Sequence, residues 1–493
     1  MPKVYAVATA TLLVLLYSVA VGSAQALPIP EDTGVPAWQV AAPETAPPAP
    51  VLPARLRPLA VPAPFAVEEM ARVSAKNDAG SPLFWSFLHR SLAREVRIAF
   101  RPADLRQAGI QGVDHAGGRL FRERDGSLVW TGRILDAPGV ESLGLRLGRM
   151  ALPPGARVWI SGEDGSFRWI PADSKEPETV TPVVSGPRVR LGIRFPASAS
   201  GSFFVTVTGF FHELPDAAAE AKSQQPWPVT PGTLRPCLID SSCVDVARFP
   251  ELRLFRKGVA FIARNDGSTC TGFLIRSYRP RQEVYFLTAN HCLPDNASAR
   301  RATIYWDYFT DRCGGASRVS LSGKPTARLG ELLLASRERD YSLFRIGALP
   351  AGRYALPWSE ESLSGAQLRS GQGMRPFILG HALGKPQSWA EVSADPPGAP
   401  PASSTSRFPC NFDREQWVVS KPIQGNALAG ASGGPLLTSF GVGGLQSRHC
   451  NDVKILPKDS CQVTRANPNH IVSSWLLGIL EAGNGGSPLF ARP

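Results

Sequence analysis

The chain has 493 residues, of which 43% are hydrophobic and 19% are charged. This length suits two or three domains, and the hydrophobic fraction is ordinary for a globular protein. The formal charge of +12 at pH 7 comes from scattered basic residues without a Lys/Arg-rich run. We therefore interpret the charge as a basic soluble surface, and we predict no nucleic-acid partner.

The N-terminus has the pattern of an export signal. Met1-Pro2-Lys3 gives a short positive start, Val4–Val21 is mostly apolar, and small residues follow up to Ala26. A membrane anchor is the alternative, because the apolar run is about long enough to span a bilayer. The small residues favour cleavage instead. We therefore predict a signal peptide over 1–26, secretion (extracellular or periplasmic), and no stable membrane span after cleavage.

The next two segments differ sharply in composition. Residues 27–66 are rich in proline and alanine, which predicts an extended linker. Over 67–213, stretches of alternating apolar and polar residues are separated by turn residues, which predicts a β-rich pro-domain with a sandwich-like fold. The clearest stretches are Glu95–Phe100, Arg188–Phe195 and Ser202–Val207. Three isolated histidines in this domain are interpreted as structural or solvated: His89, His115 and His212.

A polar, proline-bearing connector over 214–231 leads to a cysteine-bearing domain over 232–482. An even number of cysteines in one half of an exported chain predicts a disulfide-braced domain. The cysteines are Cys237, Cys243, Cys270, Cys292, Cys313, Cys410, Cys450 and Cys461. No C-x-x-C pair is present in the sequence, so we predict neither a metal nor a cofactor. Short strands are predicted through this domain, with a short helix over Val472–Leu480 and a frayed tail over 483–493.

Three residues in this domain have settings that suit nucleophilic catalysis. His291 follows a predicted strand that ends at Thr288, and Asp340 precedes an apolar stretch. A serine hydroxyl needs an imidazole to take its proton and a buried carboxylate to orient that imidazole. We predict Ser432 as the nucleophile, His291 as the base and Asp340 as the orienting group. Two other carboxylates compete with Asp340 for that role but lie in a more polar loop: Asp307 and Asp311.

Glycines surround Ser432 in Gly430-Ala431-Ser432-Gly433-Gly434. They allow a tight bend that exposes a nucleophile, and they let amide groups point into one cavity. We predict that the backbone N–H groups of Gly430 and Ser432 bind the oxyanion of a tetrahedral intermediate.

The sequence blocks Thr288–Cys292, Asp340–Leu343 and Gly430–Pro435 resemble the three triad blocks of chymotrypsin-like serine proteases. More closely, residues 235–480 resemble bacterial lysyl endopeptidases, with a Cys-x-Ile-Asp-x-x-Cys element at Cys237–Cys243 and a Tyr-Trp-x-Tyr element at Tyr305–Tyr308. This resemblance implies an all-β fold, a double six-stranded β-barrel with its site between the barrels, in an exported precursor with a pro-region. It also implies the disulfides Cys237–Cys450, Cys243–Cys313 and Cys270–Cys292, which leaves Cys410–Cys461 as a fourth.

Two departures from the resembling families matter for function. Ala431 stands where trypsin-like zymogens place the Asp that receives the freed amine, so we predict activation by removal of an obstructing pro-region. The pocket positions are occupied by uncharged residues, namely Asn426, Gln446 and Ala466. A buried cation without a carboxylate is costly, so Lys specificity is not predicted. Asp452 or Asp459 remains an alternative source of charge, although a solvated loop position is the simpler interpretation of both.

Together these features predict a secreted serine endopeptidase that forms an acyl-enzyme on a peptide or protein substrate and also binds its own pro-domain. The alternative is a catalytically inactive binding or adhesion protein on the same fold. An esterase that uses the same three residues is chemically allowed and remains a further alternative. The sequence leaves open whether the N-terminal β domain assists folding, inhibits the protease or recruits substrate.

Overall fold

The structure is a computed structural model, and it describes most of the chain from residue 83 to residue 450 together with shorter segments on either side. The described residues are 35, 39–41, 57–62, 67–78, 83–170, 178–214, 238–277, 283–313, 319–358, 376–395, 417–438, 441–450, 455–456, 460–461 and 470–475. The predicted signal peptide, most of the connector and the predicted tail lie outside these ranges. No helix within them is long and apolar enough to cross a membrane.

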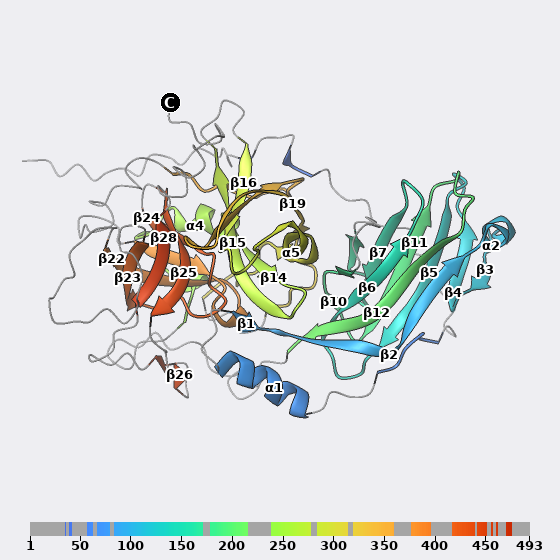
Figure 1. Cartoon of the computed structure of the whole chain (residues 1–493), viewed down its shortest axis with the longest axis horizontal. Coiled ribbons are helices and arrows are strands. Elements are labelled where there is room, and N and C mark those ends of the chain that lie inside the picture. Colours follow the sequence, from blue (N-terminus) through green and yellow to red (C-terminus); the bar gives the residue numbers. More distant parts are fainter. Residues whose placement is uncertain are drawn as a thin grey trace, which may run out of the picture. The chain divides into compact units, whose positions relative to one another are not determined.

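The N-terminal β domain consists of two antiparallel sheets that share one core (Figure 1). The first has five strands, in the order β10-β6-β12-β2 with β9 beside β6. Their bounds are β2 Phe87–Phe100, β6 Ser142–Ala151, β9 Thr179–Val180, β10 Val184–Ser185 and β12 Phe203–Glu213. The second has six strands, in the order β3-β4-β5-β11-β7-β8. Their bounds are β3 Val113–His115, β4 Gly118–Arg122, β5 Leu128–Asp136, β7 Arg157–Ser161, β8 Phe167–Ile170 and β11 Arg188–Phe195.

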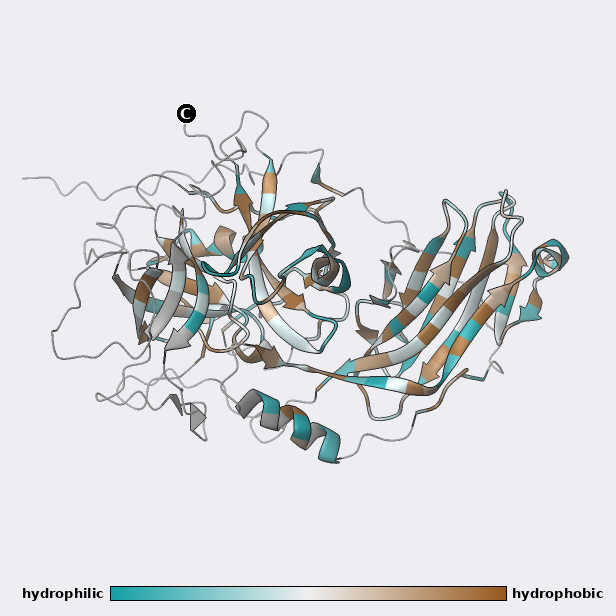
Figure 2. Ribbon diagram, in the orientation of Figure 1, coloured by the Kyte–Doolittle hydropathy of each residue, from teal (hydrophilic) through white to brown (hydrophobic). Residues whose placement is uncertain are grey.

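Alternation of side chains explains this packing. In β11, Val189, Leu191 and Ile193 are fully buried, whereas Arg188 and Arg190 are exposed. Successive side chains of a strand point to opposite faces, so this pattern directs one face of β11 into the core. Figure 2 shows hydrophobic and hydrophilic residues alternating along the strands of this domain. The predicted strand over Arg188–Phe195 is confirmed with the same bounds.

Helices occur in this half where the sequence interpretation placed only β-structure. Helix α1 covers Val67–Asp78, with Glu68 and Glu69 in its first turn and Lys76 in its last. Acidic residues near the N-terminus of a helix and basic ones near its C-terminus are favourable to the helix dipole. A second helix, α2 over Pro102–Gln107, begins with proline, which suits the first helical position. Each helix is indicated by only a few residues in the sequence. The alternation of apolar and polar residues in the rest of the domain favours an interpretation as β-structure throughout.

Two pieces of the predicted linker make specific contacts. The side chain of Gln39 is buried; its Nε2 donates to the carbonyl of Val284 (3.1 Å), and its Oε1 accepts from the Val284 N–H (3.0 Å). Val40 forms an isolated bridge with Leu349, and Ala60 forms one with Leu135 of β5. Described parts of this proline-rich segment therefore lie against ordered strands.

The C-terminal half contains two larger antiparallel sheets. The first has the order β18-β17-β14-β15-β16-β20-β19, and β1 joins it beside β15. Its strands are β1 Phe84–Trp85, β14 Val259–Ala263, β15 Ser268–Arg276, β16 Val284–Thr288, β17 Thr303–Tyr305, β18 Thr326–Ala327, β19 Leu329–Ser336 and β20 Tyr341–Ile346. Short helices lie beside them: η2 Ser241–Cys243, α4 Leu252–Phe255, η3 Arg256–Gly258 and α5 Asn296–Arg301.

The second sheet closes on itself. Its order is β13-β22-β21-β24-β25-β28-β23, and an additional pairing of β22 with β23 completes a ring of strands. The strands are β13 Ile239–Asp240, β21 Phe377–Gly380, β22 Ser388–Asp395, β23 Trp417–Gln424, β24 Pro435–Thr438, β25 Gly441–Cys450 and β28 His470–Trp475. A separate pair is formed by β26 Ile455–Leu456 and β27 Ser460–Cys461. The predicted all-β, chymotrypsin-like fold is confirmed by these curled antiparallel sheets.

The predicted helix that starts at Val472 is wrong over its described part, which is strand β28. Ser473 of this strand pairs with Val418 on one side and with Gln446 on the other. Ile471 and Val472 are β-branched and suit a pleated strand. Pairing with a strand on each side favours this conformation over the predicted helix. Residues 476–480 lie outside the described residues.

Candidate active site

His291 lies in a turn that follows strand β16. The turn is closed by the Cys292 N–H, which donates to the carbonyl of Ala289 (3.1 Å). A disulfide joins Cys292 to Cys270 of β15, and the Arg264 guanidinium donates to the carbonyl of His291 (2.9 Å). The backbone that carries the imidazole is therefore held from three directions.

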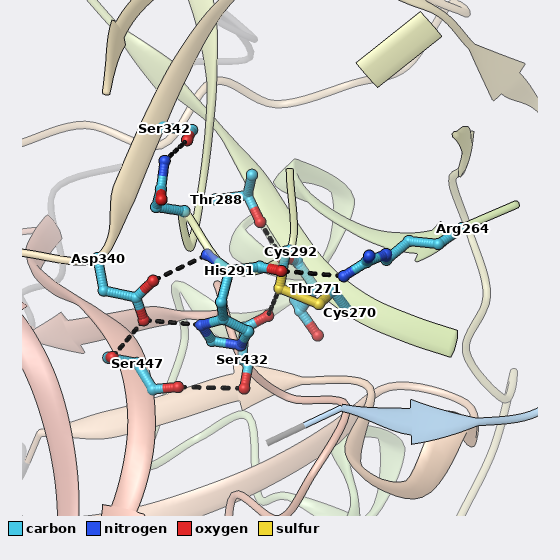
Figure 3. Close-up of polar contacts among 11 residues, drawn as sticks. Arg264, Cys270, Thr271, Thr288, His291, Cys292, Asp340, Ser342, Ser432 and Ser447 are labelled. Carbon is cyan, nitrogen blue, oxygen red and sulfur yellow. Dashed lines mark hydrogen bonds and ion pairs between the residues drawn. A yellow bond between two sulfur atoms is a disulfide. The ribbon is translucent and has the colours of Figure 1, made fainter. Parts of the chain in front are cut away.

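Asp340 lies immediately before β20 and faces His291 (Figure 3). Its Oδ2 accepts from Nδ1 of His291 (2.8 Å), and its Oδ1 accepts from the His291 backbone N–H (2.9 Å). Asp340 adopts a left-handed backbone with φ of 51°, a conformation that aspartate tolerates better than most residues. The two competing carboxylates are placed elsewhere: Asp307 pairs with Arg353 (2.6 Å), and Asp311 is exposed.

The carboxylate of Asp340 is held in its ionised form. Burial by itself raises the pKa of Asp340, but hydrogen bonds from His291 and Ser447 and the charge of His291 outweigh it, so that the pKa is lowered overall. The proton on Nδ1 is donated to this carboxylate, which leaves Nε2 as the ring nitrogen that can act as a base. Nε2 is buried and has no hydrogen-bond partner among the described residues.

Ser432 lies in the glycine-rich turn before β24 and is buried. Gly430 and Gly433 have φ of 90° and 87°, and a Cβ built on Gly433 would collide with the carbonyl of Thr271. Only glycine combines this conformation with such a close approach. The Ser432 carbonyl accepts from the Thr271 N–H (2.8 Å), which ties the turn to β15. The predicted bend around Ser432 therefore has a steric cause.

Ser447, a residue that the sequence interpretation missed, connects Ser432 with Asp340. Its Oγ donates a short hydrogen bond to Asp340 Oδ2, and its carbonyl accepts from Ser432 Oγ (3.1 Å). The Ser432 hydroxyl points to this carbonyl instead of to His291 Nε2 (Figure 3). The structure thus brings Asp340 into contact with His291 and places Ser432 beside them through Ser447. No motif marks Ser447 in the sequence, because only β25 pairing brings it to the site.

Replacing Ser447 with alanine is expected to lower kcat by about 10-fold while the fold persists. The change removes a hydrogen bond to a charged group, and such bonds contribute about 1.5–3 kcal/mol. Losing a donor also raises the pKa of Asp340 toward its ordinary value. Steady-state kinetics on a peptide substrate measures the effect. The matched control is Ser277→Ala, at a buried serine that follows the last residue of β15. If kcat were the same for Ser447→Ala and Ser277→Ala, Ser447 would have no role in catalysis.

Both predicted oxyanion donors, Gly430 and Ser432, lie in the described turn before β24. Between Gly430 and Gly434, the Ala431 N–H donates to Leu428 (3.0 Å) and the Gly433 N–H donates to the carbonyl of Gln446 (2.7 Å). The carbonyl of His381 packs against Gly430, and burial lowers the pKa of His381 to about 3, which keeps its ring neutral.

Two of the three predicted pocket residues, Asn426 and Gln446, are buried close to the Ser432 turn. Gln446 Nε2 donates to the carbonyl of Ala427 (2.9 Å), and Gln446 Oε1 has no hydrogen-bond partner in the described part of the chain. Ala466 lies outside the described residues, as do Asp452 and Asp459.

Two disulfides are formed in the structure, Cys243–Cys313 and Cys270–Cys292. The side chains of the other two expected pairs, Cys237–Cys450 and Cys410–Cys461, are outside the described residues. Cys270, His291 and Cys292 place their ligand atoms within 4.8 Å of one another. The two sulfurs are bonded to each other, so they are not available as the thiolates that bind metals.

Comparisons with known proteins agree with this architecture. Residues 232–452 match the sequence model of the lysyl endopeptidase C-terminal domain. Lysyl endopeptidase of Pseudomonas aeruginosa is 26% identical over 194 residues, which is 38% of this chain and 38% of that protein's length. The curled antiparallel sheets give an all-β, chymotrypsin-like fold, and the sequence of residues 232–452 is similar to a protease domain. The chain is related, through this domain, to lysyl endopeptidase.

Similar solved structures are more distant. A Mycobacterium tuberculosis protease in an inactive form is 15% identical, with a TM-score of 0.30, over 50% of this chain and 98% of that one. A scabies mite inactivated protease paralogue is 13% identical, with a TM-score of 0.31, over 46% of this chain and 96% of that one. Neither likeness bears on activity.

Proposed function

We propose that the chain is a secreted serine endopeptidase, made as a precursor, that cleaves peptide bonds through Ser432, His291 and Asp340. The observation that carries this proposal is the His291–Asp340 pair, joined by a hydrogen bond of 2.8 Å, with Ser432 beside it. Such a pair turns a neutral imidazole into an oriented general base.

The proposed reaction begins when Ser432 Oγ rotates from the carbonyl of Ser447 toward His291 Nε2. Catalytic hydrogen bonds are often loose before substrate binds, so this rotation is compatible with activity. Oγ then bonds to the peptide carbonyl carbon while Nε2 takes its proton. His291 returns that proton to the leaving amine as the C–N bond breaks, and water hydrolyses the acyl-enzyme through the same base.

In this proposal the backbone N–H groups of Gly430 and Ser432 bind the oxyanion. Donors fixed in a turn stabilise charge without reorganising when it develops. The left-handed conformation of Gly430 supports the assignment, since it orients this turn in a way that residues with a Cβ rarely adopt.

We propose that the acyl-side pocket accepts an uncharged or small side chain. The named relative acts on lysyl bonds, but Asn426 and Gln446 are neutral and buried here. A lysine ammonium buried beside them would lack a paired carboxylate at those two positions, which is unfavourable. Secretion and activation by removal of the N-terminal half complete the proposal; the two disulfides are compatible with an oxidising compartment.

Incubation of the secreted protein with a peptide library, followed by mass spectrometry of the products, tests the function and the pocket together. We expect cleavage after one class of uncharged residue. Cleavage confined to bonds after lysine would contradict the pocket proposal alone. An intact library would favour the alternative of an inactive binding protein.

A further inference from the structure

Strand β15 offers an open edge beside the catalytic loop. On one side it pairs with β14, from Thr269 to Phe273. On the other side β16 pairs only with Gly272–Arg276, because β16 ends at Thr288 and the chain turns away toward His291. Strand β16 therefore does not pair with the part of β15 that precedes Gly272, and the catalytic loop begins where β16 ends.

Residues from the N-terminal half occupy this edge. Phe84 of β1 pairs with Thr269, and Trp85 pairs with Ser268, in antiparallel register. Thr269 already has β14 as its other neighbour, so β1 lies on the side that β16 has left. The Thr269 hydroxyl donates to the carbonyl of Phe84 (3.0 Å), and the Ser86 N–H donates to the carbonyl of Gly267 (3.0 Å). β1 is thus an added strand of the protease sheet (Figure 1).

The pairing continues into apolar packing. Phe87, the first residue of β2, also donates its N–H to the carbonyl of Gly267 (3.2 Å). Its ring belongs to a buried cluster formed by residues of both halves of the chain. The members are Phe87, Val180, Val183, Phe211, Phe261, Ala263, Tyr305, Tyr308 and Leu321. These contacts hold β1 in place as part of the uncut chain.

The occupied edge lies next to the reacting groups. Thr269 is followed by Cys270, which is bonded to the neighbour of His291, and by Thr271, whose N–H donates to the carbonyl of Ser432 (2.8 Å). At about 3.3 Å per residue, Thr269 lies only about 7 Å along the strand from Thr271.

On its other side, β1 meets the 3₁₀ turn η4 (Ala382–Gly384). A Cβ built on Gly384 would collide with the hydroxyl of Ser86 and would lie 3.3 Å from the ring of Phe84. A Cβ built on Gly430 would lie 3.2 Å from the backbone nitrogen of the same Gly384. Residues 84–86 therefore fill the space between β15 and a turn that contacts the Ser432 loop.

Open strand edges bind extended peptides by backbone pairing. The proposed acyl-side pocket residues belong to the other sheet, where Gln446 lies in β25 and Asn426 follows β23, so the part of a substrate beyond the scissile bond is assigned to the β15 side of Ser432. The geometry points to Phe84–Trp85 as an intramolecular occupant of the β15 edge that an extended substrate would need on this leaving-group side. In the uncut chain this strand excludes peptides that continue beyond the scissile bond. It does not exclude small substrates whose leaving group does not reach the edge. The inference rests on the proposed serine endopeptidase activity.

Two substrates with the same acyl residue, chosen from the peptide library, separate these effects. One is a 4-nitrophenyl ester, which has no residues beyond the scissile bond, and the other is a peptide with four residues beyond it. The full-length chain is compared with Ser86→Pro, which removes the N–H that bonds Gly267, and with Ser86→Ala, which keeps it. Because β1 is tethered to the protease, it competes with the long peptide for the β15 edge at a high effective concentration. Releasing β1 should therefore raise kcat/KM for that peptide.

We expect Ser86→Pro to raise kcat/KM for the long peptide by about 10-fold or more, mainly through KM, with the ester unchanged. Ser86→Ala should match the unaltered chain on both substrates. An equal kcat/KM for the peptide in all three proteins, with the ester hydrolysed, would overturn the strand assignment. An ester inert to all three would overturn the proposed function instead.

If Ser86→Pro alone loses ester hydrolysis, the proline has damaged the fold, and the double variant Phe84→Ala/Trp85→Ala decides. It removes side-chain contacts of β1 without constraining the backbone. The same selective gain on the peptide is expected. An unchanged kcat/KM for the peptide, with the ester hydrolysed normally, would contradict the assignment.

Discussion

Replacing Ser432 with alanine is expected to lower kcat for peptide hydrolysis by about 10⁴- to 10⁶-fold. The change removes the only oxygen that can form the acyl-enzyme in the proposed mechanism. The turn itself should persist, because the Thr271 N–H still donates to the carbonyl of residue 432 and the flanking glycines are unchanged. Residual hydrolysis would come from substrate binding and oxyanion stabilisation alone.

Single-turnover kinetics of purified variants measures this loss. Ser420→Ala is the matched control, since Ser420 is fully buried in the same barrel and its hydroxyl has no described partner. Thermal unfolding of both variants checks that they are folded. If Ser432→Ala retained activity within about 10-fold of the unaltered chain, another nucleophile would be responsible, and the mechanism would fail.

The Asp340→Asn variant is expected to lower kcat by about 10⁴-fold. Both carboxylate oxygens accept hydrogen bonds, Oδ1 from the His291 N–H and Oδ2 from His291 Nδ1 and Ser447 Oγ. An amide has one oxygen only. If the oxygen of the new amide accepts from the His291 backbone N–H, its NH₂ group faces Nδ1 of His291. Nδ1 must then accept a hydrogen bond, so the ring proton lies on Nε2. A protonated Nε2 can no longer act as a base.

The pH–rate profiles of Asp340→Asn and Asp311→Asn test this explanation. Asp311 was a competing carboxylate in the sequence and is exposed, so its variant should keep kcat within a few-fold. Hydroxide takes over part of the role of a lost base, so activity of Asp340→Asn should recover at high pH. A loss of less than 10-fold at neutral pH would mean that Asp340 does not orient His291.

Sequence patterns predicted local structure best where alternation and motif coincide. Arg188–Phe195 became β11 with the same bounds because its alternating residues match a half-buried strand. The positions of His291 and Asp340 also followed from local signals, a strand end and the start of an apolar stretch. Their hydrogen-bonded contact, across 49 residues of sequence, could only be expected from the resemblance to proteases.

The features that the sequence did not predict depend on distant pairing. Ser447 enters the site because β25 pairs with β24 and β28, which brings its hydroxyl to Asp340. Val472 lies in a strand because β23 and β25 flank it. Phe84 and Trp85 form a two-residue strand only because β15 has an open edge. None of these partners is close in sequence, so no local period or spacing indicates them.

The most direct test of the central claim is covalent labelling by a fluorophosphonate, followed by peptide mapping of the adduct. A hydroxyl reacts with such a reagent only when an adjacent base activates it. We predict one adduct, on Ser432, in the unaltered chain and none in His291→Ala. An unlabelled protein, or an adduct on another residue, would contradict the assignment of Ser432 as an activated nucleophile.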